Sequence, residues 1–388
     1  MIGKEKSIKT VSIFGSTGSI GRNAIEVILN SPKSYKIIAL TANRDVKGLI
    51  KQVRILQPEY AVISDERFYS ELKKALKDLP KIKVLAGEAA INEVAQIKCD
   101  LFLSAIVGMA ALMPTINAIR AGSYIGLANK ECLVSAGDII LKEAKKHKVK
   151  LIPIDSEHNA IYQIFENDHL DLIENIVLTA SGGPFFKYSL AQMKNITKEQ
   201  AIKHPNWQMG AKISVDSATM MNKGLEMIEA YHLFPVAKNQ IDVVIHPESI
   251  IHGLVNYSDG STLAMMSKPD MKTPISYALG FPKRIAIKHQ KLDLAKIGSL
   301  NFFTPDEKKF PALKLARKAM EAGGNSPCIL NAANEIAVSR FLDDKIAFND
   351  IIKIVVEVLE RLPYSNISSL EDVLEIDNQA RKIAKEIK

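Results

Sequence analysis

Seven short runs of apolar and β-branched residues alternate with helix-length amphipathic segments in the first 154 residues, and this alternation restricts the possible folds more than any other feature. Parallel strands need crossover helices, and these helices bury both faces of the sheet. The alternation therefore predicts an α/β fold that begins with a doubly wound, Rossmann-like parallel sheet. The expected strands lie at residues 10–14, 36–41, 60–63, 83–85, 100–105, 123–128 and 149–154.

After residue 155 the pattern changes into mixed strand-like and helix-like segments, which predict a central α+β catalytic domain. The C-terminal part reads as helical: a segment at 310–322 stops at Gly323, and residues 368–371, Ser-Ser-Leu-Glu, resemble a capping box that opens the last helix. A chain of 388 residues has room for two or three domains. We expect a dinucleotide-binding domain at 1–154, a catalytic domain at 155–285, a linker at 286–309 and a C-terminal α-helical bundle at 310–388.

The charge of the chain suits a small anionic ligand better than a nucleic acid. Lys and Arg number 51 against 43 Asp and Glu, which gives a formal charge of +8. The basic residues are scattered over what look like solvated helix faces, without an aromatic-interleaved basic stripe. We therefore expect no nucleic-acid partner.

Cysteine usage and apolar patterning indicate a reduced, cytoplasmic protein. Cys99, Cys132 and Cys328 form no Cys-x-x-Cys pair, which argues against a disulfide framework or a zinc site. No segment reaches the roughly 18 consecutive apolar residues of a membrane span. Residues 1–9 are not followed by a signal-peptide core. We expect a soluble chain that starts near Met1 and has no membrane partner.

A glycine-rich segment at residues 15–21, Gly-Ser-Thr-Gly-Ser-Ile-Gly, directly follows the first expected strand and opens the first helix. In that position glycines permit a tight turn and a close approach to pyrophosphate, while the helix N-terminus supplies N–H groups. The segment predicts a dinucleotide site, although its spacing differs from the commonest Gly-x-Gly-x-x-Gly. The alternative is a glycine-rich turn without a ligand.

The end of the second expected strand favours NADP over NAD. An NAD site normally places Asp or Glu at this strand end, whereas Asn43 and Arg44 suit a 2′-phosphate. Asp45 leaves two alternatives open. A one-residue error in the strand end would put its carboxylate near the ribose, or Asp45 caps a helix that starts near Val46.

Two carboxylates follow the last strand of the predicted sheet, at the end where such folds place their sites. Asp155 and Glu157 are two residues apart and would point the same way if the chain stayed extended. They suit a hard cation such as Mg²⁺ or Mn²⁺. The alternative is that Asp155 or Ser156 only caps a helix at 159–165.

A polar segment at 214–226 is expected to form a helix near residues 218–232. Asn222 and Glu226 are four residues apart and would share one helix face. Glu226 would complete a metal site of three carboxylates, while Ser217, Asn222 and Lys223 would hold a phosphate. A plain amphipathic surface helix is the alternative.

Three further segments have both a functional and a structural interpretation. Lys130 follows the sixth expected strand and would polarise a substrate oxygen, or it is a surface residue beside Glu131. Ser181 lies in a turn of small residues that permits a close phosphate contact, or the turn is only a turn. Trp207, the only tryptophan, lies in a polar loop at 203–209 and belongs to a mobile lid or to the core.

Six ordered motifs, distributed along the chain, resemble the signature set of the 1-deoxy-D-xylulose 5-phosphate reductoisomerase family. That family rearranges and reduces a small sugar phosphate to 2-C-methyl-D-erythritol 4-phosphate in the non-mevalonate isoprenoid pathway, generally as a homodimer. The motifs are Gly-Ser-Thr-Gly-Ser-Ile-Gly at 15–21, Leu-Ala-Asn-Lys-Glu at 127–131, Asp-Ser-Glu-His at 155–158, Ala-Ser-Gly-Gly-Pro-Phe at 180–185, His-Pro-Asn-Trp-Gln-Met-Gly at 204–210 and Asp-Ser-Ala-Thr-Met-Met-Asn-Lys-Gly-Leu-Glu at 216–226.

The resemblance implies NADPH and Mn²⁺ or Mg²⁺ as cofactors, with Co²⁺ as a further option, and it assigns residues to three roles. The metal ligands are Asp155, Glu157 and Glu226, which with Lys130 and His204 form the catalytic set. Substrate contacts are Lys130, Ser156, Glu157, Ser181, His204, Trp207, Ser217, Asn222, Lys223 and Glu226. Cofactor contacts are Gly15, Thr17, Gly18, Ser19, Ile20, Gly21, Asn43, Arg44, Asn129, Glu131 and Gly210.

At residues 43–45 this chain has Asn-Arg-Asp where other members often have Gly-Lys-Asn or Gly-Arg-Asn. The contacts to the 2′-phosphate are therefore the part of the resemblance that transfers least directly. Two other functions are compatible with parts of the sequence: an ordinary NADP-dependent semialdehyde or hydroxy-acid dehydrogenase, in which the carboxylates are structural, and a nucleotide-binding scaffold without turnover.

Overall fold

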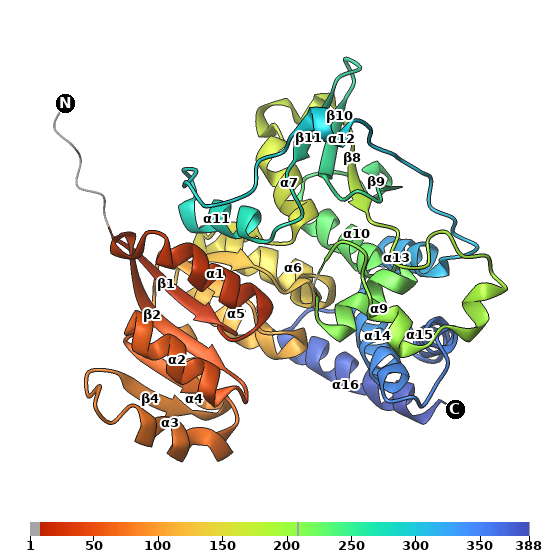
Figure 1. The fold of residues 1–388 in the computed structure, drawn as a ribbon. Helices are drawn as coiled ribbons and strands as arrows, with labels where there is room; N and C mark the ends of the chain where they lie inside the picture. The colour runs from red at the N-terminus through yellow and green to blue at the C-terminus, as the bar shows by residue number, and fades with distance from the viewer. Residues whose placement is uncertain (1–7, 208, 388) are drawn as a thin grey trace. The chain divides into compact units, whose positions relative to one another are not determined.

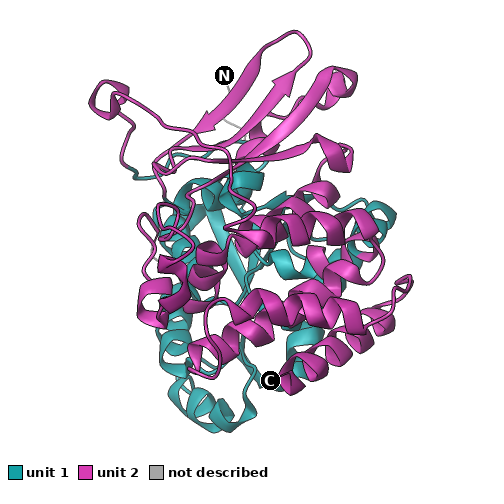
Figure 2. Cartoon of the chain, turned by 90° about the vertical axis from the view of Figure 1, so that its right-hand side faces the viewer, with its two compact units in different colours: residues 1–132, 140–159, 270–289 teal, residues 133–139, 160–269, 290–388 magenta. Residues whose placement is uncertain are grey.

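The computed structural model describes residues 8–207 and 209–387 (Figure 1). The chain divides into two compact units. The first unit comprises residues 1–132, 140–159 and 270–289, and the second comprises residues 133–139, 160–269 and 290–388 (Figure 2). The expected start near Met1, and Gln208 within the polar loop, lie outside the described residues.

The first unit is built on a seven-stranded sheet with the strand order β4-β3-β2-β1-β5-β6-β7. Every neighbouring pair is parallel. The order reverses at β1, so the crevice that such folds use for ligands lies at the carboxyl end of β1. The strands are Lys9–Phe14, Tyr35–Ala42, Tyr60–Ile63, Lys83–Ala86, Leu101–Ser104, Tyr124–Leu127 and Leu151–Pro153. The predicted doubly wound sheet is confirmed.

Helices connect these strands and bury the sheet. The core contains fully buried aliphatic residues from strands and helices, such as Ile13, Leu40 and Leu49. The connecting helices are α1 (Ser19–Leu29), α2 (Val46–Leu56), α3 (Tyr69–Ala75), α4 (Gly87–Ala95), α5 (Leu112–Arg120) and α6 (Lys130–His147).

A helix from much later in the chain also belongs to the first unit. Helix α11 (Lys272–Gly280) contributes Ile275 and Leu279 to the core of that unit. The Lys272 ammonium lies 2.5 Å from a carboxylate oxygen of Glu26 on α1. Burial of one apolar face of α11 therefore places residues 270–289 with the parallel sheet, although the sequence gives no local sign of this.

The second unit contains a four-stranded sheet with the order β11-β10-β8-β9. Strand β10 is antiparallel to β8 and β11, whereas β8 is parallel to β9. The strands are β8 (Ile173–Ala180), β9 (Ile241–Ile245), β10 (Ile251–Tyr257) and β11 (Thr262–Met266). The shorter helical elements are α7 (Ser156–Ile164), which begins in the first unit, α8 (Lys198–Ala201) and α12 (Leu294–Ile297).

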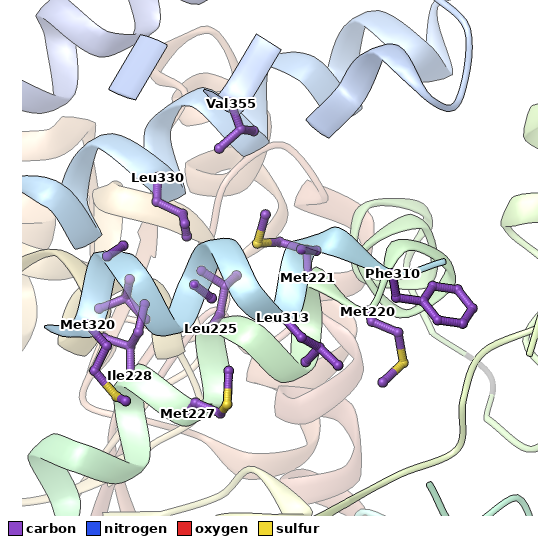
Figure 3. Close-up of a cluster of buried hydrophobic side chains, with 14 of the residues drawn as sticks. Met220, Met221, Leu225, Met227, Ile228, Phe310, Leu313, Met320, Leu330 and Val355 are labelled. Atoms are coloured by element: carbon purple, nitrogen blue, oxygen red, sulfur yellow. The ribbon is translucent and has the colours of Figure 1, made fainter. Parts of the chain in front are cut away.

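The predicted single helix near 218–232 is instead two helices. Helix α9 (Ala211–Thr219) and helix α10 (Met221–Leu233) meet at Met220, whose φ of +64° breaks the helical hydrogen-bond run. The Met220 side chain is nevertheless buried, and Figure 3 shows it with other side chains of the same apolar cluster. Core packing thus compensates a backbone conformation that L residues rarely adopt.

The C-terminal helices form the predicted α-helical bundle. They are α13 (Pro311–Ala322), α14 (Ser326–Leu342), α15 (Asp350–Arg361) and α16 (Leu370–Glu386). Helix α13 ends before Gly323, which has a φ of +68°, as predicted. The capping box of α16 lies one residue later than predicted, because Ser369 and Asp372 form it. Helix α10 packs against α13 so closely that a Cβ on Gly224 would lie 2.6 Å from the Cβ of Ala316.

The three cysteines are buried thiols outside any disulfide, as expected. Within the described ranges, no helix combines the length and apolar character needed to cross a bilayer.

Candidate active site

Backbone packing requires glycine at two positions of the loop after β1, Gly15 and Gly21. Gly15 has a φ of +89°, and a Cβ at this position would lie 2.4 Å from the carbonyl oxygen of Ala105. A Cβ on Gly21 would lie 2.5 Å from the carbonyl oxygen of Gly15. No side chain fits at either position without moving the backbone, so the loop can turn directly from β1 into α1 only with glycine here.

The first turn of α1 is suited to an anion. Among the described residues, no side chain caps the helix at Gly18, and the first turn contains no acidic residue. The N–H groups of a first helical turn have no partner inside the helix and carry positive partial charge. Gly18 and Ser19 are exposed, and Thr17 and Ile20 are half-buried. These residues therefore fit the pyrophosphate of a dinucleotide.

The structure decides between the two interpretations of Asp45. Its carboxylate accepts a 2.9 Å hydrogen bond from the Gly48 N–H, so Asp45 is the N-cap of α2. The capping interpretation is confirmed. The exposed residues at the end of β2 are Asn43 and Arg44, and the Arg44 guanidinium lies 3.2 Å from the Asp65 carboxylate.

Asn129 and Lys130 emerge where β6 turns into α6. The Asn129 side chain accepts a hydrogen bond from the Cys132 N–H and donates to the carbonyl oxygens of Ile106 and Gly108, so it ties together the loops after β5 and β6. Lys130 is only 7% exposed, as is Glu131. The Lys130 ammonium lies 2.5 Å from an Asp155 oxygen. The surface-lysine alternative is therefore wrong.

The carboxylates after β7 lie at the start of a helix. Because α7 begins at Ser156, the assumption of an extended chain from Asp155 to Glu157 is wrong, and the helix of the capping alternative begins three residues before residue 159. The Ser156 hydroxyl donates a 2.5 Å hydrogen bond to the Glu157 carboxylate. Asp155 and Glu157 offer oxygen ligands, the type that Mg²⁺ and Mn²⁺ prefer. These two residues and Lys130 belong to the first unit.

In the second unit, His204 orients Ser181 and the polar loop. The Nδ1 atom of His204 accepts hydrogen bonds from the N–H groups of Asn206 and Trp207, at 3.1 and 3.0 Å. The ring proton must then be on Nε2, which lies 2.8 Å from the Ser181 hydroxyl oxygen and donates to it. Burial lowers the pKa of His204 to about 4, so the imidazole is neutral at pH 7.

The Ser181 oxygen also accepts from the Gly183 N–H at 3.2 Å. Because the Ser181 oxygen already accepts two hydrogen bonds, the hydroxyl proton is directed toward a further acceptor, such as a phosphate oxygen. The same turn lies against the end of α9, since a Cβ on Gly183 would be 2.6 Å from the Ser217 carbonyl oxygen. The two predicted phosphate-binding segments at Ser181 and Ser217 are therefore neighbours.

Helix α10 carries a buried charged group. Glu226 is fully buried and Lys223 is 3% exposed, so the surface-helix alternative is wrong. The Asn222 side-chain amide donates a 2.5 Å hydrogen bond to Glu226, as the predicted shared face requires, and Lys223 forms an ion pair with the same carboxylate. Gly210, predicted to lie near the cofactor, is the exposed residue that precedes α9.

Two polar groups of the second unit were missed by the sequence analysis. Asp216 is buried, accepts a 2.8 Å hydrogen bond from the Asn334 side chain on α14 and lies 2.9 Å from the Lys212 ammonium. Asn206 donates to the Pro247 carbonyl and the Ser249 hydroxyl. The i, i+4 spacing of Lys212 and Asp216 was a readable signal, but the contact with Asn334, 118 residues away, had none.

A seven-stranded parallel sheet with a glycine turn and an uncapped helix at its switch point places the chain in the class of dinucleotide-binding proteins. Family models make this specific. Residues 11–137 match the model of 1-deoxy-D-xylulose 5-phosphate reductoisomerase, residues 151–234 match that of its C-terminal domain, and residues 266–383 match the DXP reductoisomerase C-terminal domain. The chain belongs to the 1-deoxy-D-xylulose 5-phosphate reductoisomerase family, and the resemblance of its six motifs is confirmed.

Individual relatives match over nearly the whole chain. The 1-deoxy-D-xylulose 5-phosphate reductoisomerase of Rhodospirillum centenum is 49% identical over 380 residues, which cover 98% of this chain and 94% of that protein. The solved structure of the enzyme from Zymomonas mobilis in complex with NADPH has a TM-score of 0.93 and 46% identity, covering 97% of this chain and 98% of that one. A DOX-P reductoisomerase structure with NADPH, fosmidomycin and magnesium has a TM-score of 0.91 and 43% identity, with the same coverage.

Proposed function

We propose that this protein converts 1-deoxy-D-xylulose 5-phosphate to 2-C-methyl-D-erythritol 4-phosphate, with NADPH and a divalent cation, in non-mevalonate isoprenoid biosynthesis. The observation that supports this most is family membership over the whole chain, at 49% and 48% identity to relatives of that name. Solved relatives contain NADPH, and one contains NADPH, fosmidomycin and magnesium together. The uncapped first turn of α1 suits NADPH, and the carboxylates of Asp155, Glu157 and Glu226 suit magnesium.

Three sets of residues divide the work. NADPH is held by the loop at 15–21, by the end of β2, and by Asn129, Glu131 and Gly210. Asp155, Glu157 and Glu226 bind Mg²⁺ or Mn²⁺, with Co²⁺ as a further option. When bound, NADPH supplies the hydride and the cation polarises the substrate carbonyl and acidifies its hydroxyl group. Lys130, held beside Asp155, donates to a substrate oxygen.

The substrate phosphate binds in the second unit. The Ser181 proton, which His204 and Gly183 leave for an external acceptor, donates to a phosphate oxygen. Ser217, Asn222 and Lys223 provide further donors, and Lys223 supplies positive charge from a site with almost no solvent exposure. Ser156 contacts the substrate from the start of α7, and the Trp207 loop excludes water.

The quaternary state and the location follow as further proposals. Strand β11 is an edge of its sheet and exposes Leu263, which is 38% accessible, so it offers a surface on which a second copy would form the expected homodimer. We place the enzyme in the cytoplasm. Along the sequence we propose a cofactor domain at 1–154, a catalytic domain at 155–285, a linker at 286–309 and a C-terminal helical domain at 310–388, with α11 as the segment of the catalytic domain that packs with the first unit.

The decisive experiment is an NADPH oxidation assay with 1-deoxy-D-xylulose 5-phosphate, run with added Mg²⁺ and after removal of metal by a chelator. We expect turnover that depends on both substrate and metal. An ordinary NADP-dependent semialdehyde or hydroxy-acid dehydrogenase would instead act on its simple substrate with or without the chelator. Absence of NADPH oxidation with the sugar phosphate would overturn the proposal.

A further inference from the structure

The segment after β3 lies beside the predicted 2′-phosphate position at the end of β2. Strands β2 and β3 are parallel neighbours, with Ala42 opposite Ile63. Their pairing continues beyond both strands, because the Asp65 N–H donates a 3.1 Å hydrogen bond to the Asn43 carbonyl oxygen. A short 3₁₀ helix at Glu66–Phe68 follows. The side chains of that turn are therefore close to Asn43 and Arg44, although the two segments are about twenty residues apart in sequence.

Two arginines meet at one carboxylate oxygen in this region. Asp65 Oδ2 accepts from Arg44 Nε at 3.2 Å and from Arg67 Nη2 at 2.5 Å, and Asp65 Oδ1 accepts from Arg67 Nε at 2.8 Å. The Asp65 side chain is 12% exposed, whereas those of Arg44 and Arg67 are 70% and 72% exposed. Asp65 is thus a nearly buried anchor that holds two accessible guanidinium groups next to each other.

The group of Asp65, Arg44 and Arg67 has a net positive charge and N–H donors that Asp65 does not use, so it can bind an anion. Two guanidinium groups against one carboxylate give a net charge of +1, and the pKa of Asp65 is held well below its usual range, chiefly by its hydrogen bonds with Arg67, so the carboxylate stays ionised. Each guanidinium has five N–H donors. The Asp65 contacts use one donor of Arg44 and two of Arg67. Of the other acids nearby, Asp45 is engaged at the N-terminus of α2, and the Glu66 carboxylate lies beside Gly87.

We propose that Arg67 is a second specificity-determining residue for NADPH, which acts with Arg44 as a pair that Asp65 positions to bind the 2′-phosphate of the adenosine ribose. This inference rests on the proposed NADPH dependence. Guanidinium groups bind phosphate through paired, charge-assisted hydrogen bonds, which a neutral 2′-hydroxyl cannot match. Arg67 follows β3, whereas the glycine motif follows β1 and Arg44 follows β2. Neither the composition nor the glycine motif therefore indicates Arg67 as a cofactor contact.

The test measures binding to the full chain by calorimetry, without substrate or metal. The ligands are NADPH, NADH and the fragment 2′,5′-ADP, compared for wild type, Arg67→Ala, Arg67→Lys and Arg54→Ala. Arg54 is a matched control. It forms a similar two-contact ion pair with Asp78, at 2.9 and 3.0 Å, but lies in the last turn of α2, about 12 Å along the helix from Val46, the first residue of α2.

We expect Arg67→Ala to weaken binding of NADPH and of 2′,5′-ADP about tenfold or more, and to change the Kd for NADH less than about twofold. Arg67→Lys restores part of the loss because it keeps the charge without the paired donors. Arg54→Ala leaves all three affinities unchanged. Equal weakening of NADPH and NADH, or no weakening of either, in an Arg67→Ala protein with an unaltered Tm would refute the role of Arg67. If wild type binds NADPH no better than NADH, the NADPH dependence itself is overturned, and this inference with it.

Discussion

The loop after β1 and the polar group on α10 represent two different ways of building a binding site. The loop presents backbone N–H groups at the start of α1, and its critical residues are glycines with no room for a Cβ. The group on α10 presents side chains, with Glu226 and Lys223 nearly inaccessible to solvent. The first depends on local chain geometry and the second on burial by distant segments, so the two should respond differently to substitution.

Burial makes the second site the more sensitive one. Two buried charges are costly to desolvate, and removal of one leaves the other without compensation. The Glu226 carboxylate pairs with Lys223 and accepts from Asn222, so it organises both of its neighbours on α10. The loop after β1 contains no buried charge that a substitution could remove. Only a substitution that adds side-chain volume disrupts it.

Replacement of Glu226 with Gln should lower kcat about 100-fold or more and weaken Mn²⁺ binding, because the shape is kept while one ligand charge is lost. The KM for the sugar phosphate should change much less. Steady-state kinetics and Mn²⁺ titration measure these effects. Glu335→Gln is the control, since Glu335 also forms a partly buried ion pair, with Arg381 on α16, and should retain near-normal kcat. If Glu226→Gln retains wild-type kcat and Mn²⁺ affinity, the assignment of Glu226 to the metal is wrong.

Replacement of Gly15 with Ala should raise the Kd for NADPH about tenfold or more and lower stability by about 2 kcal/mol. The reasons are the positive φ and the 2.4 Å approach to the Ala105 carbonyl. The control Gly260→Ala separates the backbone strain of a positive φ from the steric clash of an added Cβ. Gly260 has a similar φ of +86°, but its Cβ would meet nothing within 4 Å. We expect that control to lose about 1 kcal/mol of stability and no NADPH affinity. Equal effects of the two substitutions on NADPH binding would contradict the packing argument.

Replacement of His204 with Ala should raise the KM for 1-deoxy-D-xylulose 5-phosphate about fivefold or more. The change removes the donor that orients Ser181 and the acceptor that holds the Trp207 N–H. Because Trp207 is the only tryptophan, its emission reports on this loop. Saturating 1-deoxy-D-xylulose 5-phosphate, added without NADPH, should change the emission of wild type and change that of the variant less. Wild-type emission that is indifferent to ligand would argue against a lid.

The same histidine gives a pH dependence with a definite sign. Its folded-state pKa, lowered to about 4, lies below the usual value of 6.5, so the unfolded chain binds the proton more readily. His204 therefore favours unfolding increasingly as pH falls from 6.5 toward 4 and has no such effect above 6.5. Denaturant unfolding at several pH values measures this effect. Between pH 6.5 and 4 the free energy of unfolding should fall less steeply for His204→Ala than for wild type.

Replacement of Asp45 with Ala should have the smallest effect, a loss of about 1 kcal/mol of unfolding free energy with an unchanged Kd for NADPH. Asp45 caps α2 and is not expected to contact the ribose. Asp45→Asn retains a capping oxygen and should stay within about 0.5 kcal/mol of wild type. A large change in the ratio of NADPH to NADH affinity would show that the carboxylate also acts on the cofactor.

The comparison also explains where sequence reasoning succeeded. The strands of the first unit and the turn at residues 15–21 were predicted, and the cap at Asp45 was one of two interpretations left open. Each depends on a pattern within a few residues: apolar periodicity, glycine in a turn, and a carboxylate before a helix. The shared face of Asn222 and Glu226 was predicted for the same reason. The role of each residue in the proposed metal and substrate sites came from the family resemblance, which no single pattern could replace.

The features that depend on packing between distant segments could not be predicted from the sequence. Met220 divides α9 from α10 because core contacts compensate its positive φ, and α11 joins the first unit because its apolar face is buried there. The burial of Lys130 and Glu226 was undetermined at the sequence level, since the same helix pattern fits a surface. The bond from Asn334 to Asp216 spans 118 residues. Elements and motifs arise from near neighbours along the chain, so the amino-acid pattern was enough to predict them. Burial and partnership arise from residues that only folding brings together, and the tertiary structure alone decided them.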